Sequence, residues 1–151
     1  MNPMDEQKAL RQAWMSLLAK AGADDLARLW SGLNIAVDHT LLRAPEIGGV
    51  MVRGRSGAIG AAFNLGEMTV TRCSVKLTSG EVGHAYVQGR DKDKALQAAL
   101  IDALMQTAHA AQVETEVLQP LKDGMLAVAT ARAAKAAATK VEFFTMVRGE
   151  D

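Results

Sequence analysis

The amino-acid sequence predicts an α+β fold, in which an antiparallel sheet of about five strands is packed with helices. Three observations lead to this prediction: apolar residues recur at helical spacing in two parts of the chain, they alternate with polar residues in between, and mostly short connections separate the alternating segments. The elements are expected in the order ααββββααβ. No repeat or linker divides the chain, so residues 1–151 are expected to form a single domain.

Two helices are predicted near the start of the chain, joined by a short turn. The apolar stripe of the first helix is formed by Leu10, Trp14, Leu17 and Leu18. Gly22 is expected to end this helix, and Asp24 and Asp25 suit the cap or first turn of the second. The buried stripe of the second helix comprises Leu26, Leu29, Trp30 and Leu33.

Four strands are predicted next, because the apolar spacing changes from helical to alternating. Pro45 and Glu46 are expected to separate the first two strands, and a glycine-rich loop (Gly54 to Gly60) follows the second. A tight turn at residues 78–80 joins the last two. In chain order, the strands are expected at Ile35–Leu41, Val50–Arg53, Met68–Leu77 and Val82–Gln88. The mostly short connections favour antiparallel pairing.

The second half of the chain predicts two further helices and a last strand. Asp91 or Asp93 is expected to cap a deeply buried helix that extends to about Ala111. Pro120 interrupts the helical pattern, and an alanine-rich helix is expected at Leu121–Ala138. Alternation then predicts a closing strand that contains Val141, Phe143, Thr145 and Val147.

Charge and cysteine content narrow the class of protein. Lys and Arg together number 17, as do Asp and Glu, so no bulk electrostatic attraction to nucleic acid or membrane is expected. The single Cys73 cannot form an internal disulfide, a zinc site made of cysteines alone or an iron–sulfur cluster. Met1–Lys8 does not have the pattern of a signal peptide, and no apolar run reaches the roughly 18 residues of a membrane span. We therefore expect a soluble cytoplasmic domain.

Catalytic and metal-binding motifs are weak in this sequence. His39, His84 and His109 are scattered without metal-ligand spacing, so no metal site is expected within this chain alone. Cys73 alternates with Val75 along a predicted strand, which favours a core position over a nucleophile. The glycine-rich loop lacks the Gly-Lys-Ser/Thr ending of a Walker A motif.

The strand Met68–Leu77 places Arg72, Ser74 and Lys76 on one face. Two cations beside a hydroxyl could hold a phosphate or phosphonate, form a solvated outer face, or contact a partner protein. These three interpretations stay open.

The turn after the last of these strands carries another cation, Arg90. A helix N-terminus attracts anions, but Asp91 and Asp93 would occupy its free N–H groups, so capping is favoured over phosphate binding there. Arg90 would then stay available to a ligand or a neighbouring protein.

Phe143 and Phe144 stand back to back on the predicted closing strand, where they would face opposite sides. Both would then be buried only if both faces of the strand are covered. A second polypeptide could cover one face, or this domain could cover both.

In five segments, the sequence resembles the PhnG family, the G subunit of the bacterial carbon–phosphorus lyase core complex. These segments are RQAWMSLLA (Arg11–Ala19), TVTRCSVKL (Thr69–Leu77), YVQGRDK (Tyr86–Lys92), ALIDALMQ (Ala99–Gln106) and VEFFTMVRGED (Val141–Asp151). They extend in order over nearly the whole chain, and the last three are the more specific.

The resemblance implies a role in phosphonate breakdown as one subunit of a complex, and a chain that is inactive alone. The family's G subunit joins the H, I and J subunits in a core complex with two copies of each. With the I, H and L subunits it supports a transferase step, in which a phosphonate such as methylphosphonate displaces adenine from ATP. The product is α-D-ribose 1-methylphosphonate 5-triphosphate. In this family, the iron–sulfur cluster that cleaves the carbon–phosphorus bond belongs to the J subunit, so no cofactor is expected on this chain. ATP is expected as a substrate of the complex.

The resemblance transfers no catalytic residue to this sequence. The candidates for binding substrate or another anion are the polar residues inside the matching segments, namely Arg72, Lys76, Gln88, Arg90 and Arg148. They would neutralise triphosphate or phosphonate charge, or bind the I subunit. The candidates for an interface are Phe143, Phe144 and Met146. The alternative is a purely structural scaffold subunit without substrate contact.

Overall fold

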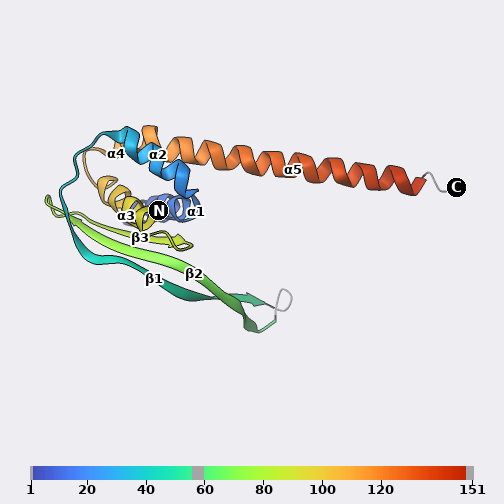
Figure 1. The fold of residues 1–151 in the computed structure, drawn as a ribbon, viewed down its shortest axis with the longest axis horizontal. Helices are drawn as coiled ribbons and strands as arrows, with labels where there is room; N and C mark the ends of the chain where they lie inside the picture. The colour runs from blue at the N-terminus through green and yellow to red at the C-terminus, as the bar shows by residue number, and fades with distance from the viewer. Residues whose placement is uncertain (1, 56–59, 149–151) are drawn as a thin grey trace.

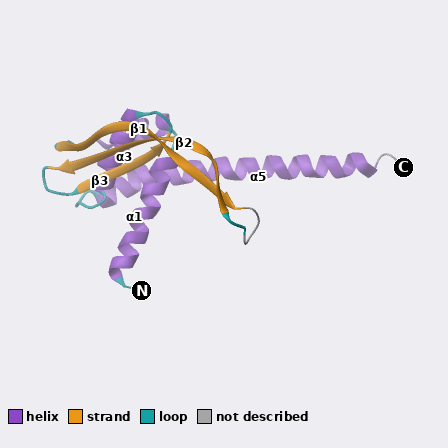
Figure 2. Ribbon diagram, turned by 90° about the horizontal axis from the view of Figure 1, so that it is seen from below, coloured by secondary structure: helices purple, strands orange, loops and turns teal. Residues whose placement is uncertain are grey.

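The computed structural model describes residues 2–55 and 60–148, and for Asn64 and residues 141–148 only the course of the backbone. The elements in chain order are α1 (Pro3–Lys20), α2 (Ala23–Leu33), β1 (His39–Arg55), β2 (Ala62–Leu77), β3 (Val82–Gln88), α3 (Lys92–Leu104), α4 (Ala110–Val113), the π-helical turn η1 (Glu114–Leu118) and α5 (Gln119–Arg148). Helices cover one face of the sheet, and the described residues leave its other face bare (Figures 1 and 2).

The predicted α+β class is confirmed, with fewer strands than expected. Across the described residues the sheet has three antiparallel strands in the order β1-β2-β3. The predicted helical hairpin is confirmed as α1 and α2, with Asp24 and Asp25 in the first turn of α2. Asp91 caps α3 as predicted, but that helix ends at Leu104 instead of about Ala111.

The prediction that Pro45 separates two strands is wrong. The first two predicted strands form one strand, β1, which crosses Pro45 where its pairing with β2 shifts register between Arg43 and Glu46. Since β1 lies at the edge of the sheet, a proline at an irregularity there removes no bond that the ladder requires. β2 likewise begins at Ala62 instead of Met68, so β1 and β2 extend together as a ribbon. Residues 56–59 of the predicted glycine-rich loop lie outside the described residues.

The predicted closing strand is also wrong, because residues 141–148 continue helix α5. Pro120 does not stop this helix, since it lies in the first turn of α5, directly after η1. The alanine-rich stretch has high helix propensity, and each further residue adds a hydrogen bond within the helix itself. The segment that carries Phe143 and Phe144 therefore has a helical backbone instead of the predicted strand.

The core lies between α3 and the covered face of β2 and β3, with α1, α2 and η1 packed around it. Alternate residues of the two strands, Cys73, Val75, Leu77, Ala85 and Val87, face this core. α3 approaches closely because β3 has a glycine there: a Cβ added at Gly83 would lie 2.0 Å from the carbonyl oxygen of Ala99. We call this closed part of the molecule the body.

Two elements project from the body (Figure 1). One is the far part of the β1–β2 ribbon, residues 47–55 and 62–68, which we call the arm. Its exposed apolar side chains are Ile47, Met51, Val52, Phe63 and Leu65. The other is α5, whose residues from Lys122 to Lys140 are exposed except for the half-buried Met125. No helix in the described part of the chain is both long and apolar enough to cross a membrane.

Candidate functional site

The bare face of the sheet collects polar side chains from two adjacent strands. As predicted, Arg72, Ser74 and Lys76 of β2 face away from the buried Cys73. β3 adds three exposed side chains to the same face: His84, Tyr86 and Gln88. This polar face combines two cations with hydroxyl, imidazole and amide groups.

An ion-pair network ties Arg72 to β1. The Arg72 guanidinium lies 3.4 Å from the Glu46 carboxylate, and Arg43 lies 3.1 Å from the other oxygen of the same carboxylate. The hydrogen bond from Arg72, followed by its charge and the contribution of Arg43, lowers the pKa of Glu46. The three side chains are about half exposed, so the network is weak and an anion could draw Arg72 away from Glu46.

The structure also places a hydroxyl beside an imidazole on this face. Ser74 Oγ lies 2.8 Å from His84 Nδ1, and the two residues are directly paired across β2 and β3. Sequence reasoning missed this pair, although a hairpin turning at residues 78–80 brings residues 74 and 84 opposite each other. No carboxylate among the described side chains orients the imidazole, so the pair resembles a cross-strand hydrogen bond more than a nucleophile with its base.

The other anion-binding candidates are not gathered into one site. Gln88 is a diagonal neighbour of Arg72 across the two strands, whereas Lys76 is four residues further along β2, about 13 Å away. Arg90 is exposed in the turn before α3, next to Gly89. Arg148 is the last residue of α5, and its side chain is outside the described set. The candidates therefore mark at least two separate regions.

The start of α3 is closed by its own residues, as predicted. The Asp91 carboxylate accepts a hydrogen bond from the Lys94 amide at 2.9 Å. The Thr71 hydroxyl donates to the Gly89 carbonyl at 2.7 Å and accepts from the Asp91 amide at 3.2 Å. These bonds occupy the amide N–H groups of Asp91 and Lys94, two of the donors that an anion could use at this helix end.

Asp102 is the main polar residue that sequence reasoning missed. It lies on α3, its side chain is fully buried, and it accepts hydrogen bonds from Arg11 Nε at 3.1 Å and Arg11 Nη2 at 2.8 Å. It also accepts Trp14 Nε1 and the His84 amide, both at 2.8 Å. The hydrogen bond to Asp102 raises the pKa of Arg11. An aspartate within an otherwise apolar helix could have predicted this cluster from the sequence, because a buried charge needs hydrogen-bonding partners. This cluster joins α1, α3 and β3, so its role is structural.

Two other titratable groups are buried in the body. Burial raises the pKa of the Cys73 thiol, which confirms its predicted core position. Lys94 is 6% exposed, and its ammonium group donates to the Ala19 carbonyl at 3.2 Å. Burial lowers the pKa of Lys94, and the charge of Asp91 opposes this shift. Within residues 2–55 and 60–148, no three His, Cys, Asp or Glu side chains converge as metal ligands.

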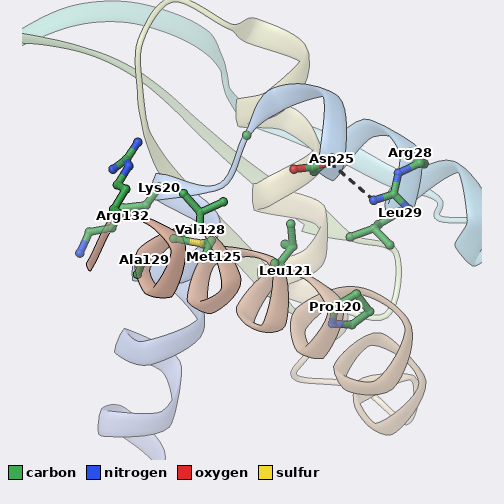
Figure 3. Close-up of a pocket in the computed structure, with 12 residues that line it drawn as sticks. Lys20, Asp25, Arg28, Leu29, Pro120, Leu121, Met125, Val128, Ala129 and Arg132 are labelled. Carbon is green, nitrogen blue, oxygen red and sulfur yellow. Dashed lines mark ion pairs between the residues drawn. The ribbon is translucent and has the colours of Figure 1, made fainter. Parts of the chain in front are cut away.

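A groove of about 530 Å³ lies between α2 and the first turns of α5, where α5 leaves the body (Figure 3). Lys20 and Arg132 stand together at one end of it. Arg28 stands at the other end and pairs with Asp25 at 3.5 Å. The apolar wall between them is formed by Leu29, Leu121, Met125 and Val128. This groove was not expected from the sequence, since it depends on how the two helices meet.

The interface candidates Phe143, Phe144 and Met146 lie in the last turns of α5, beyond the body (Figure 1). Only the backbone is described there. Their proposed role as an interface stays a prediction, now on a helix instead of a strand.

Comparisons with known proteins agree with the resemblance of the five segments. The sequence model of the family described as "Phosphonate metabolism protein PhnG" matches residues 9–149. A protein of Rhizobium meliloti (strain 1021), named alpha-D-ribose 1-methylphosphonate 5-triphosphate synthase subunit PhnG, is 45% identical over 148 residues. The match covers 97% of this chain and 94% of that protein. The chain therefore belongs to the PhnG family.

Proposed function

We propose that this chain is a subunit of a complex that makes α-D-ribose 1-methylphosphonate 5-triphosphate in phosphonate breakdown. The complex transfers the ribose 5-triphosphate part of ATP to a phosphonate such as methylphosphonate and releases adenine. The name of the Rhizobium meliloti relative, which calls it a synthase subunit, supports the assignment. The H, I, J and L subunits are the proposed partners, with two copies of each core subunit, in the cytoplasm.

The observation that best supports a role within a complex is the exposed arm. Met51 is 55% exposed and its neighbour Val52 is 38% exposed, and successive strand residues point to opposite faces. Leu65, on the other strand of the ribbon, is 62% exposed. A two-stranded ribbon with apolar side chains on both faces is marginal in water. Partner subunits on this arm would remove those side chains from water.

The polar face of the sheet is the proposed region of contact with substrate. Arg72 and Gln88 are close enough to share one anionic group, and His84 offers a further hydrogen-bonding nitrogen. The proposed role of these residues is electrostatic: they hold phosphate or phosphonate charge at a site that a partner subunit completes.

Reconstitution tests the assignment. The chain is co-expressed with its proposed partners, and adenine release from ATP plus methylphosphonate is measured for the full complex, the complex without this chain, and the chain alone. We expect activity only in the full complex. Undiminished adenine release without this chain would remove the proposal.

Substitutions of Arg72 on the polar face and of Arg90 in the turn before α3 separate substrate contact from a purely structural scaffold. The hypothesis of a purely structural scaffold is supported by the ion pair between Arg72 and Glu46, because Arg72 already has a partner within this chain. Arg72→Ala and Arg90→Ala are assayed in assembled complexes, with Lys8→Ala on α1 as the charge-matched control. Lower adenine release with intact assembly indicates substrate contact, and unchanged turnover indicates a scaffold.

A further inference from the structure

Along one face of helix α5, the side chains change from apolar to cationic where the helix leaves the body. From Gln119 to Lys140 it is about 33 Å long. Along one face, positions spaced by three or four residues are first apolar and then cationic: Leu121, Met125, Val128, Arg132 and Lys135. Leu121 is 4% exposed, whereas Val128 is already 53% exposed. The apolar face therefore continues past the point where the body covers it.

The charge of this region is one-sided, although the chain as a whole has a formal net charge of zero. From Gln119 to Lys140, α5 carries four cations, Lys122, Arg132, Lys135 and Lys140, against one acid, Asp123. Lys20 and Arg28 add two more cations along the groove at its base, where Asp25, the partner of Arg28, is the one acid of the lining. Neither Lys20 nor Arg132 forms an ion pair with any carboxylate in the described part of the chain.

We propose that this groove and the adjoining face of α5 dock an acidic amphipathic helix of a partner polypeptide. The partner's apolar side chains would cover the wall formed by Leu29, Met125 and Val128, and its carboxylates would meet Lys20 and Arg132. The inference rests on the proposed function, because it requires a partner subunit.

Charge and shape favour this occupant over two others. A second copy of the same face would bring Arg132 and Lys135 against cations of equal sign, which opposes self-association. An anionic membrane would attract the cations, but the part of the apolar wall at Leu121, which is 4% exposed, lies between α2 and α5, where a flat bilayer cannot reach it (Figure 3).

Charge reversal at one end of the groove is the first test. Lys20→Glu combined with Arg132→Glu is expected to weaken binding of the companion subunits at least tenfold, and raised salt should weaken binding of the unmodified chain. The control is Lys122→Glu, which reverses a charge on the same helix but in a different groove, beside Glu114. We expect the control to assemble normally. Equal assembly by the double variant would overturn the inference alone. Failure of the unmodified chain to assemble would overturn the proposed function as well.

Cross-linking within the assembled complex identifies the occupant, even if the double variant is unstable. A photoreactive benzoylphenylalanine replaces Val128 in the groove or, as a control, Leu126, which lies about 200° away around the helix. The probe at position 128 should attach to an acidic helical segment of a different subunit, and the probe at position 126 should not. Attachment to a second copy of this chain, or to a segment without acids, would contradict the proposal.

Flotation with vesicles of phosphatidylglycerol and phosphatidylcholine tests whether the chain binds an anionic membrane instead. The unmodified chain should not float with them at physiological salt. Flotation that the double variant loses while still assembling would overturn the choice of a protein partner.

Discussion

Helices α3 and α5 are both rich in alanine, yet they have opposite environments. On α3 the alanines are buried against the sheet, and they include Ala95, Ala98, Ala99 and Ala103. On α5 every alanine from Ala127 to Ala138 is exposed (Figure 1). A small side chain allows close approach, but only a facing surface turns that property into packing. The comparison teaches that the body has a packed core of its own, whereas α5 and the arm present surfaces that no other described residue of the chain covers.

The buried aspartate of α3 gives the largest expected contrast between the two helices. Asp102→Ala leaves the Arg11 charge and the Trp14 N–H without their shared acceptor, so we expect a loss of about 3 kcal/mol in the free energy of unfolding. Asp123→Ala on α5 removes only an exposed contact to Gln119 and should change it by less than about 0.5 kcal/mol. Urea unfolding of both variants measures the difference, and similar effects would break the contrast.

Glycine substitutions are expected to have opposite signs in the two regions. Gly83→Ala forces a Cβ against the backbone of α3, which should destabilise the fold by about 2 kcal/mol. Gly124→Ala on α5 meets no atom within 4 Å and replaces a poor helix former, so it should stabilise by about 0.5–1 kcal/mol. Thermal unfolding of each variant is the measurement. Stabilisation by Gly83→Ala would mean that α3 is not tightly packed on β3.

The buried Lys94 predicts a pH dependence that belongs to the body. Because burial lowers its pKa in the folded state, the unfolded chain binds more protons in alkaline solution, and Lys94 makes stability rise as pH increases through that range. Cys73, whose folded pKa is raised, contributes in the opposite direction. Both proteins contain Cys73, so its contribution cancels when the free energy of unfolding of the unmodified chain is subtracted from that of Lys94→Met. The Lys94→Met variant should be more stable than the unmodified chain near neutral pH, and this advantage should shrink in alkaline solution. Urea unfolding at a series of pH values measures it.

Substitutions in the arm should have the smallest effect on the isolated chain. Met51→Ser and Leu65→Ser alter side chains that are already mostly in water, so each should change the free energy of unfolding by less than about 0.5 kcal/mol. In the assembled complex the same changes should reduce recovery of the companion subunits. A matched exposed apolar residue outside the arm, Met4→Ser on α1, serves as the control. Equal losses of assembly for all three variants would contradict the proposal that partner subunits bind the arm.

Local patterns predicted the parts of the fold that local physics controls. The Asp91 cap, the alternation from Thr71 to Leu77 and the apolar stripes of α1 and α2 followed from side-chain spacing, except that Leu10 of the α1 stripe is 58% exposed. The wrong predictions concern segments whose structure depends on residues far away in the sequence. The segment Val141–Val147 satisfies both an alternating pattern and a helical continuation, and no neighbouring strand is there to pair with it within the described residues.

The candidate site was predictable only in part for the same reason. The exposure of Arg72 and Lys76 on one face followed from the strand period, and the pairing of Ser74 with His84 was contained in the hairpin register. The Asp102 cluster and the groove beside α5 unite residues separated by about 90 to 110 positions, and a single sequence does not reveal such distances.

Hydrogen exchange, compared between the free chain and the assembled complex, tests the central claim most directly. If partner subunits cover the arm and α5, amides in residues 47–55, 62–68 and 122–140 should gain protection on assembly, while the already buried α3 should change little. Unchanged exchange in the arm and in α5, with new protection confined to the body, would contradict the account.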